Sequence, residues 1–333
     1  MVGVAPALPV AAATSPVTIA APMTTSAVGT GAISATSLAT ALIGPGVGTI
    51  SNATYTGVPA QVGAFHVADA SVVSFNDGVI MSSGDIANVT GPNKSESITG
   101  IGNGLDDPDL NSLIAGSQTV VQQTYDAASL EFNFVPNANT VNFTYVFGSD
   151  EYLEWVNLFN DVFGFFVTPD SSVHNPATAT NCATVPDPNN APARLPVSID
   201  SINSTVNPTL YRDNSAWNPP TNPLNIEPDG LTVEMICSAQ VVAGHVNHIK
   251  LAIADTSDQI LDSVVMIKGG SLSTTPAESC NDGIDDNGDG KIDMEPGIED
   301  PECSNQSYVT AATTSAPVSG GTIQVPGTGT SGM

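Results

Sequence analysis

Short runs of β-forming residues recur through the middle of this 333-residue chain, and each run ends at a turn rich in Gly, Asn, Asp or Pro. Runs of this length and composition are typical of strands in antiparallel sheets. Many of them at this spacing predict a mainly β protein built as a β-sandwich or jelly roll. The predicted strands cover residues 64–67, 78–82, 128–135, 140–147, 162–167, 231–239, 247–254 and 263–269.

Helical signals are confined to two short segments. The spacing of apolar residues predicts a helix over 35–43, with Thr36 or Ser37 as its N-cap. A second short helix is predicted over 109–115, entered through acidic capping residues. The stretch 169–228 is rich in Pro and Asn and is expected to form long loops held by a disulfide.

The charge balance excludes several classes of partner. The chain has 33 acidic but only 6 basic side chains, a net charge of −27, so it repels phosphate backbones and anionic lipid surfaces. We therefore expect no nucleic-acid binding, and divalent cations are the natural partners. No stretch reaches the roughly 18 apolar residues that a membrane-spanning helix needs, so no membrane span is expected.

Four cysteines indicate an oxidising compartment. They allow three pairings, of which we favour the sequence-local one, Cys182 with Cys237 and Cys280 with Cys303. Free buried thiols are the alternative. Residues 1–13 are apolar but contain no Lys or Arg, so they lack the basic start of a signal peptide. We expect an extracellular or cell-surface protein whose export signal is absent from this chain.

The clearest chemical signal lies between the last two cysteines. The run from Asp285 to Asp293 matches a calcium-loop pattern, in which alternate side-chain oxygens converge on one cation and Gly290 permits a sharp turn. The predicted ligands are Asp285, Asn287, Asp289, Asp293 and Asp300, together with Lys291 through its backbone carbonyl. An acidic, turn-rich linker that binds nothing tightly is the alternative. Calcium is accordingly the predicted cofactor.

This loop departs from the EF-hand pattern at its last position. Pro296 stands where the closing bidentate Glu would be, and Pro also prevents a helix from continuing there. The side chains that could close the shell instead are Asp282, Asp293, Glu295 and Asp300. The segment resembles the Cys-bracketed calcium repeats of bacterial surface proteins and, more distantly, thrombospondin type 3 and dockerin loops. That resemblance implies structural calcium in an extended connector, without catalysis.

A second group of carboxylates lies between two aromatic strands. The stretch 143–167 places a loop with several Asp and Glu residues between runs rich in Phe, Tyr and Val. Carboxylates beside so many rings are costly to bury unless they are paired, capped or metal-bound. We predict a second calcium site where this loop meets the strand end at 255–262, with simple turn capping as the alternative. The predicted ligands are Asp150, Glu151, Asn160, Asp161, Asp255 and Asp262, with Asp258 nearby.

The central part of the chain resembles the bacterial choice-of-anchor L domain over about residues 35–272. The matching blocks are Leu42–Gly46, Ser51–Gly57, Gly78–Asp85, Phe147–Tyr152, Phe159–Phe166, Asp229–Thr232, His248–Asp255 and Asp262–Lys268. The resemblance implies an exported surface domain of β-sandwich type with no established reaction. Neither a hydrophobic helix nor a sorting motif follows Ser304, so the chain is not expected to carry its own anchor.

The sequence shows no enzymatic machinery. Asp150, Glu151 and Glu154 could supply the paired carboxylates of a glycosidase, but only two Trp residues are available to stack on a sugar. His245 and His248 fall in a predicted strand or turn, where their side chains point apart, so they are not expected to bind zinc. Phosphate-binding and nucleophile motifs are missing from the sequence. We therefore expect a protein that is not an enzyme.

Two non-enzymatic roles remain. In the first, which we favour, the protein is a structural subunit of a surface filament or layer, and a spare strand of one copy completes the open sheet edge of the next. The segment 16–22 has the composition of such a donor strand. In the second, the protein is a monomeric adhesin or carbohydrate-binding module, with Trp155 or Trp217 stacking on a surface polysaccharide beside calcium.

Composition divides the chain into four regions. These are an extended N-terminal arm at 1–33, the β domain at 34–272, the calcium-loop module at 273–303 and a Thr-, Ser- and Gly-rich tail at 304–333. The tail contains one β-prone run at 321–325. Neither the arm nor the tail has enough apolar side chains to fold alone, so both are expected to be extended.

Overall fold

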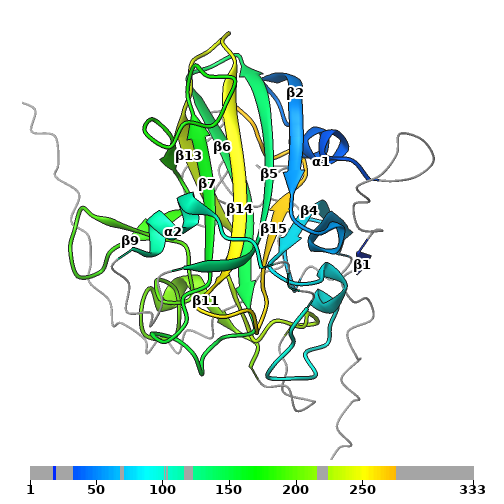
Figure 1. Ribbon diagram of the computed structural model, residues 1–333, viewed down its shortest axis with the longest axis vertical. Helices are drawn as coiled ribbons and strands as arrows, with labels where there is room; N and C mark the ends of the chain where they lie inside the picture. Colours follow the sequence, from blue (N-terminus) through cyan, green and yellow to red (C-terminus); the bar gives the residue numbers. More distant parts are fainter. Residues whose placement is uncertain are drawn as a thin grey trace, which may run out of the picture.

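The computed structural model describes residues 18–19, 33–67, 71–100, 102, 104–115, 123–215 and 224–274. Two antiparallel β-sheets pack face to face in this part of the chain (Figure 1). The mainly β architecture predicted from the sequence is confirmed. Several predicted features lie outside the described residues: the calcium loop, the Cys280–Cys303 pair, Trp217 and the run at 321–325.

The larger sheet has the strand order β1-β3-β4-β15-β6-β12-β11, and β13 also pairs with β6. Its strands are β1 (Thr18–Ile19), β3 (Val62–His66), β4 (Asp77–Ser82), β6 (Thr140–Ser149), β11 (Tyr211–Asp213), β12 (Gly230–Thr232), β13 (Met235–Gln240) and β15 (Ser263–Lys268). The smaller sheet has the order β2-β5-β14-β7-β8. Its strands are β2 (Val47–Thr56), β5 (Thr124–Pro136), β7 (Val162–Thr168), β8 (Thr180–Asn181) and β14 (Asn247–Thr256). A separate pair joins β9 (Thr184–Pro186) to β10 (Arg194–Pro196).

Aromatic side chains fill the space between the two sheets. Alternate residues of a strand point to the same face, so β6 and β7 each send a row of rings inward. Phe143 packs on Phe165 with ring centroids 4.5 Å apart, and Tyr145 packs on Phe163 at 5.3 Å. All four side chains are buried. These pairs join the centre of the larger sheet to the centre of the smaller one.

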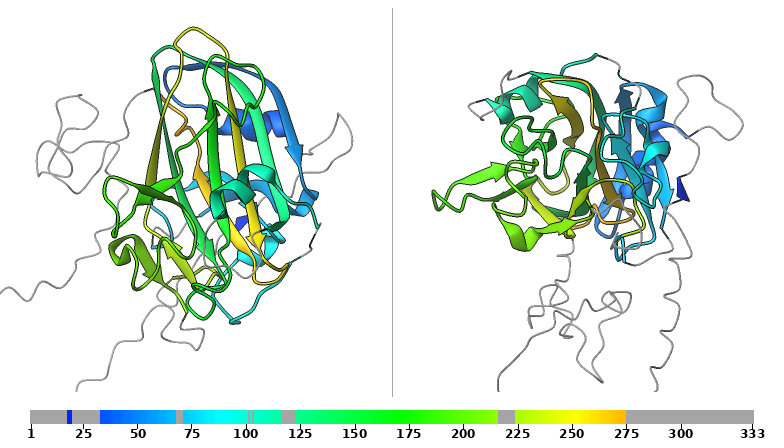
Figure 2. Two further views of the ribbon diagram at one scale, coloured as in Figure 1. Left: turned by 60° about the vertical axis from the view of Figure 1, so that its left-hand side comes forward. Right: turned by 90° about the horizontal axis from the view of Figure 1, so that it is seen from below.

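Loops and a short helix cover the outer faces of the sheets (Figure 2). On the larger sheet, Ile80, Val146 and Met266 belong to a second apolar cluster that includes loop residues. On the smaller sheet, Leu110 and Ile114 of the second helix pack over a third cluster. Because the central strands are buried on both faces, they appear in the sequence as continuous apolar runs rather than alternating ones.

Two α-helices occur within the described residues, close to the predicted positions. They are α1 (Ala35–Leu42) and α2 (Pro108–Ile114). The predicted cap of the first helix, Thr36 or Ser37, is wrong. Ser34 is the N-cap, because its hydroxyl and that of Ser37 accept hydrogen bonds from each other's backbone amides in a reciprocal capping box. The short 3-10 helices are η1 (Pro59–Gln61), η2 (Ile86–Val89) and η3 (Pro208–Leu210).

Each predicted strand is present, but one is divided and several further strands occur, among them the short β8, β9, β10 and β11 in the stretch 169–228 that was expected to form loops. The run 231–239 forms two strands, β12 and β13, because the chain leaves β6 between them and the Val233 amide donates to the Leu210 carbonyl at 2.8 Å. Strand β2 was not predicted. It is an edge strand whose residues are mostly exposed or half-buried, so it lacks the apolar pattern that marks a core strand.

A disulfide joins Cys182 to Cys237, with the two Cα atoms 5.3 Å apart, as predicted. Cys182 directly follows β8 in the smaller sheet, and Cys237 lies within β13 of the larger sheet. The bond therefore links the two layers of the sandwich. It also fastens the loop-rich segment that follows β7.

Replacing both Cys182 and Cys237 with Ala is expected to lower the free energy of unfolding by about 2–5 kcal/mol, because the bond closes a long loop in the unfolded chain. Urea denaturation of the variant and of the reduced wild type measures the loss. The reduced wild type should lose at least as much as the variant, because reduction also breaks the predicted Cys280–Cys303 bond. A loss below about 1 kcal/mol in both would contradict the proposed role of the bond.

Candidate metal site

Five strand ends meet at one end of the sandwich. The pairings Ser263 with Ser149, Gly230 with Ser149, and Ala254 with Val162 bring the ends of β6 and β14 beside the starts of β7, β12 and β15. Seven acidic residues lie in or directly beside these strand ends, and they are termed here the carboxylate cluster. They are Asp150, Glu151, Asp161, Glu227, Asp229, Asp255 and Asp262, with exposures between 0% and 7%.

The loop between β6 and β7 is held by hydrogen bonds to two neighbouring segments. The amide of Asp150 donates to the Asp262 carbonyl at 3.1 Å, which ties the start of the loop to the start of β15. Farther along, the Asn157 amide donates to the Asp200 carboxylate at 2.6 Å, and the Asp200 amide donates to Oδ1 of Asn160 at 3.1 Å. Asn160 therefore braces this loop against a neighbouring one.

The turn from β14 to β15 has an unfavourable backbone conformation. Ser257 and Leu261 have φ values of 79° and 69°, a region that L side chains rarely adopt. The pairing of β14 with β5 also shifts register between Ile253 and Asp255. Such bulges redirect side chains, and strain of this kind gathers at functional sites. Here both features flank residues of the carboxylate cluster.

The carboxylate cluster has few hydrogen-bond donors. Asp161 is the best satisfied member, since Oδ1 accepts from the Thr256 amide at 2.9 Å and Oδ2 accepts from the Ser263 hydroxyl at 2.8 Å. The buried oxygens without a hydrogen bond of ordinary geometry are Asp150 Oδ1, Glu151 Oε2, Glu227 Oε2, Asp229 Oδ2, Asp262 Oδ2 and both carboxylate oxygens of Asp255. Asp150 nevertheless interacts with Glu227, and Asp255 interacts with Asp161 and Ser83. In the described part of the chain, no ion pair with Lys, Arg or His involves these seven residues.

Burial makes these groups resist ionisation. It raises the pKa of Asp161 and of Asp229 to about 8, and that of Asp262 to about 6. Burial also raises the pKa of Asp150 well above its usual value, and the neighbouring charges of Glu227 and Asp229 raise it further. Without a cation, Asp161 and Asp229 therefore stay largely protonated at neutral pH, because ionising them would place negative charge where water is scarce.

The donor set suits a hard cation. It consists of carboxylate oxygens without thiols or imidazoles, which is the preference of calcium or magnesium rather than zinc. Among the described residues, no three His, Cys, Asp or Glu side chains are placed so that they could hold a metal ion together. Binding of calcium here would require the carboxylates to move inward and amide, carbonyl or water oxygens to complete the shell.

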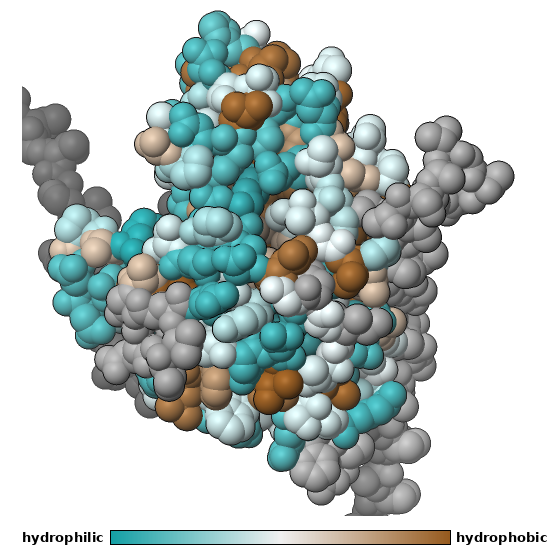
Figure 3. All heavy atoms as spheres, viewed as in Figure 1, coloured by the Kyte–Doolittle hydropathy of each residue, from teal (hydrophilic) through white to brown (hydrophobic). Residues whose placement is uncertain are grey.

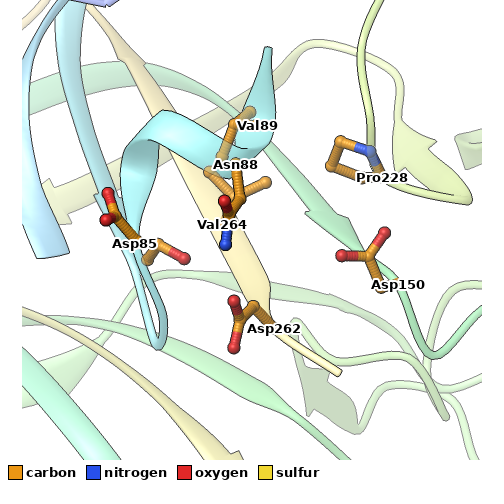
Figure 4. Close-up of a pocket in the computed structure, with 8 residues that line it drawn as sticks. Asp85, Asn88, Val89, Asp150, Pro228, Asp262 and Val264 are labelled. Carbon is orange, nitrogen blue, oxygen red and sulfur yellow. The ribbon is translucent and has the colours of Figure 1, made fainter. Parts of the chain in front are cut away.

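A hollow opens beside the cluster. Asp150 and Asp262 line it together with Asn88 and Pro228, and Figure 4 shows these side chains arranged around the same space. The hollow is small and holds about one water molecule.

The structure brings the predicted second site together at one end of the sandwich. Asp150, Glu151, Asp161, Asp255 and Asp262 all belong to the cluster, and Asn160 braces the loop beside them. Two members, Glu227 and Asp229, were not predicted as ligands. The Asp-Gly pair at the entry to β12 was the available signal, because Asp is frequent where a strand begins at a turn. The predicted ligands between 285 and 300 lie outside the described residues.

The two histidines at 245 and 248 have separate partners. Nδ1 of His245 lies 2.7 Å from Asp170, whereas His248 lies 3.0 Å from Glu131 and 2.7 Å from Asn133. They therefore face different surroundings, as their positions in the sequence suggested.

With divalent cations removed by EDTA, the free energy of unfolding is expected to fall as the pH rises from about 4 to about 8. Unfolded carboxyls titrate near 4, whereas burial raises the pKa of Asp262 to about 6 and those of Asp161 and Asp229 to about 8. The folded protein thus holds more protons across this window, so losing them destabilises the fold. Urea denaturation at several pH values in the window measures the trend, and a flat or rising free energy would contradict it.

A family model described as the choice-of-anchor L domain matches residues 27–273. That range includes every member of the carboxylate cluster. No curated protein and no solved structure matches the chain. Within the described residues, no helix has the length and apolar character needed to cross a membrane.

Proposed function

The chain belongs to the choice-of-anchor L domain family, which indicates a cell-surface protein, and we propose that it is a non-enzymatic, calcium-stabilised subunit of an extracellular assembly. The observation that carries the proposal is the carboxylate cluster, in which several buried oxygens have no hydrogen bond of ordinary geometry. Leaving a charged group buried and unpaired is strongly destabilising. Calcium bound there would compensate the charge and hold together five strand ends and two loops.

The burial of the cluster favours a structural ion over catalysis. A glycosidase needs two carboxyl groups on either side of an accessible sugar. The carboxylates considered for that role are Asp150, Glu151 and Glu154. Asp150 and Glu151 are only 4% and 1% exposed, whereas Glu154 is exposed on the surface. A substrate of that size would have no contact with the buried pair.

Calcium is expected to raise the melting temperature of the full chain strongly, and EDTA to lower it. Because the predicted loop at 285–293 could also bind calcium, the same measurement is made on the Asp285→Asn/Asp289→Asn variant, which keeps the carboxylate cluster. An ion present at about 100 times its Kd contributes about 2.7 kcal/mol. If this variant melts at the same temperature in calcium and in EDTA, the cluster does not bind calcium.

The proposed assembly route uses the edge of the larger sheet. The backbone of Thr18–Ile19 pairs antiparallel with β3, with Thr18 opposite His66 and Ile19 opposite Phe65. These two residues lie inside the predicted donor segment 16–22. The edge of β3 thus accepts a strand from the N-terminal arm of its own chain, and an arm from a neighbouring copy could use the same hydrogen-bonding positions.

Electron microscopy tests this route. Deletion of residues 1–30 should abolish filaments or layers, whereas deletion of residues 1–14 should leave them intact, because the second variant keeps the strand that pairs with β3. Assemblies that survive the longer deletion would rule out strand addition by the arm. If the wild type forms no assemblies, the protein acts as a separate surface module.

One observation favours adhesion as the second candidate. Trp155 is 38% exposed and packs edge-on against Phe159 with ring centroids 5.5 Å apart, in the loop that begins at the carboxylate cluster. The face seen in Figure 3 is mostly hydrophilic, with small separate hydrophobic groups. This role would be supported if the protein bound neutral polysaccharides only in calcium. The Trp155→Ala variant should then lose the binding while its melting temperature stays unchanged.

A further inference from the structure

We propose that the side chains of Lys250 and Asp107 join in a covalent amide bond, with Asp109 carrying the protons. This bond would lie on the outer face of the smaller sheet, under α2, and would fasten the helix to β14. It is a modification separate from the calcium binding and the assembly proposed above. It follows from three side chains that the fold brings into direct contact where little water reaches.

The amine and two carboxylates are already in contact. Nζ of Lys250 lies 2.7 Å from Oδ2 of Asp107 and 2.6 Å from Oδ2 of Asp109. The three side chains are 8%, 9% and 11% exposed. Nζ also lies 5.9 Å from the ring centroid of Phe166, which belongs to the apolar cluster under α2. Charges are costly to keep in such a place, and an amide removes both charges of the pair that forms it.

The backbones of the two reacting residues are both held by β5. Lys250 lies in β14, opposite Glu131 of β5 on one side and Phe166 of β7 on the other. The Asp107 amide donates to the hydroxyl of Thr124, the first residue of β5, at 2.9 Å. Groups held together in this way react without the entropic cost of being brought together.

Asp107 has the surroundings of the carboxyl group that is attacked. Its Oδ1 accepts hydrogen bonds from the amides of Asp109 and Leu110, at 3.0 and 3.1 Å, whereas its Oδ2 faces Lys250. The two amides would stabilise the negative charge that develops on Oδ1 when nitrogen adds to the carboxyl carbon. Oδ1 then remains as the amide oxygen, so the start of α2 keeps both hydrogen bonds.

Asp109 has the position of the proton carrier. A general base must lie within about 2.6–3.2 Å of the group that it deprotonates, and Oδ2 of Asp109 is 2.6 Å from Nζ of Lys250. Burial lowers the pKa of Lys250, but Asp107 and Asp109 raise it more strongly through their charges and hydrogen bonds. The ion pair is therefore the starting state. Transfer of a proton to Asp109 frees the nitrogen lone pair, which is the nucleophile.

The reaction is a condensation that needs no other reactant. The lone pair of Nζ forms a bond to Cγ of Asp107, and the bond from Cγ to Oδ2 breaks. Two of the three ammonium protons pass through Asp109 to Oδ2, which leaves as water, and the third stays on the amide nitrogen. Asp109 ends as the carboxylate that it was at the start. The total charge is unchanged, and nothing is oxidised or reduced.

Mass spectrometry of the full chain, unfolded and with its disulfides reduced, tests for the bond. The wild type should be lighter than its sequence by one water molecule, and its digest should contain Lys250 and Asp107 in one branched peptide. Lys250→Met should have its full sequence mass, while the control Lys268→Met should keep the deficit. A wild type of full mass after prolonged incubation would overturn the proposal, since the contacts would then be an ion pair only.

Two further variants test the roles of the carboxylates, and the wild-type measurement remains decisive if either fails to fold. Asp107→Asn can still react, with ammonia leaving in place of water, so it should be lighter than its own sequence by one ammonia molecule. Asp109→Asn keeps Lys250 beside Asp107 but lacks the proton carrier, so it should stay at full mass. A branched peptide containing Asp109 in place of Asp107, or a bond formed in Asp109→Asn as fast as in the wild type, would overturn these assignments.

Discussion

Replacing Asp255 with Asn is expected to stabilise the calcium-free protein and to destabilise the calcium-loaded one. The side chain is 1% exposed, and Ser83 is a neighbouring side chain that favours its ionised form. Burial raises its pKa well above the usual value, and the charges of Asp161 and Asp262 raise it further. Asn has nearly the same shape and no charge, so it removes this repulsion when calcium is absent. In calcium, the same change removes a ligand.

The loss in calcium should be large. An ion present at about 1,000 times its Kd contributes about 4.1 kcal/mol, and most of that disappears if the variant no longer binds it. Thermal and urea denaturation in EDTA and in calcium measure both signs. The matched control is Asp77→Asn, whose side chain is 75% exposed and which should change stability by less than about 0.5 kcal/mol in either condition. A change of the same sign in both conditions would show that Asp255 is not a cation ligand.

The strands could be predicted where local sequence and tertiary position agree. β6, β7, β14 and β15 are buried on both faces, and their apolar runs are recognisable without knowledge of their partners. β2 could not be found in this way, because as an edge strand it owes its pairing to β5 rather than to an apolar pattern of its own.

The carboxylate cluster was partly predictable for a related reason. Asp150, Asp161 and Asp255 follow or precede apolar strands, and in an antiparallel sheet alternate strand ends lie together. Glu227 and Asp229 reach the same place just before β12. Their position depends on the pairing of β12 with β6, which involves a strand of three residues. No local pattern specifies such a contact.

A buried polar network on the smaller sheet also escaped prediction. Lys250 in β14 lies under α2, and its ammonium group is 2.7 Å from Asp107 and 2.6 Å from Asp109. The three side chains are 8%, 9% and 11% exposed. Nε2 of His174 lies 2.9 Å from the same carboxylate of Asp109. The contact joins residues about 140 positions apart, which nothing in either local sequence indicates.

The energy of this network depends on all of its charges being present. Burial favours the neutral form of Asp109, but hydrogen bonds from Lys250 and His174 outweigh it and lower the pKa of that carboxyl. Asp107 is also the N-cap of α2, because its Oδ1 accepts hydrogen bonds from the Asp109 and Leu110 amides. The lysine therefore compensates two carboxylates that the helix start keeps buried.

Replacing Lys250 with Met is expected to lower the free energy of unfolding by about 3–5 kcal/mol, because it leaves two buried carboxylates without their cation. Met preserves most of the packing against Phe166, whose ring centroid lies 5.9 Å from the ammonium nitrogen. The control Lys268→Met, at the half-buried end of β15, should cost less than about 1 kcal/mol. Urea denaturation in calcium measures both.

Compensating changes separate charge from shape at this position. In the Lys250→Met background, Asp107→Asn and Asp109→Asn should together recover much of the loss, since Asn keeps an oxygen for the helix cap and removes the unpaired charges. If the triple variant is no more stable than Lys250→Met alone, the lysine acts through packing. Recovery would instead show that the lysine acts through its charge on buried acids, as a cation from solution is proposed to act at the carboxylate cluster.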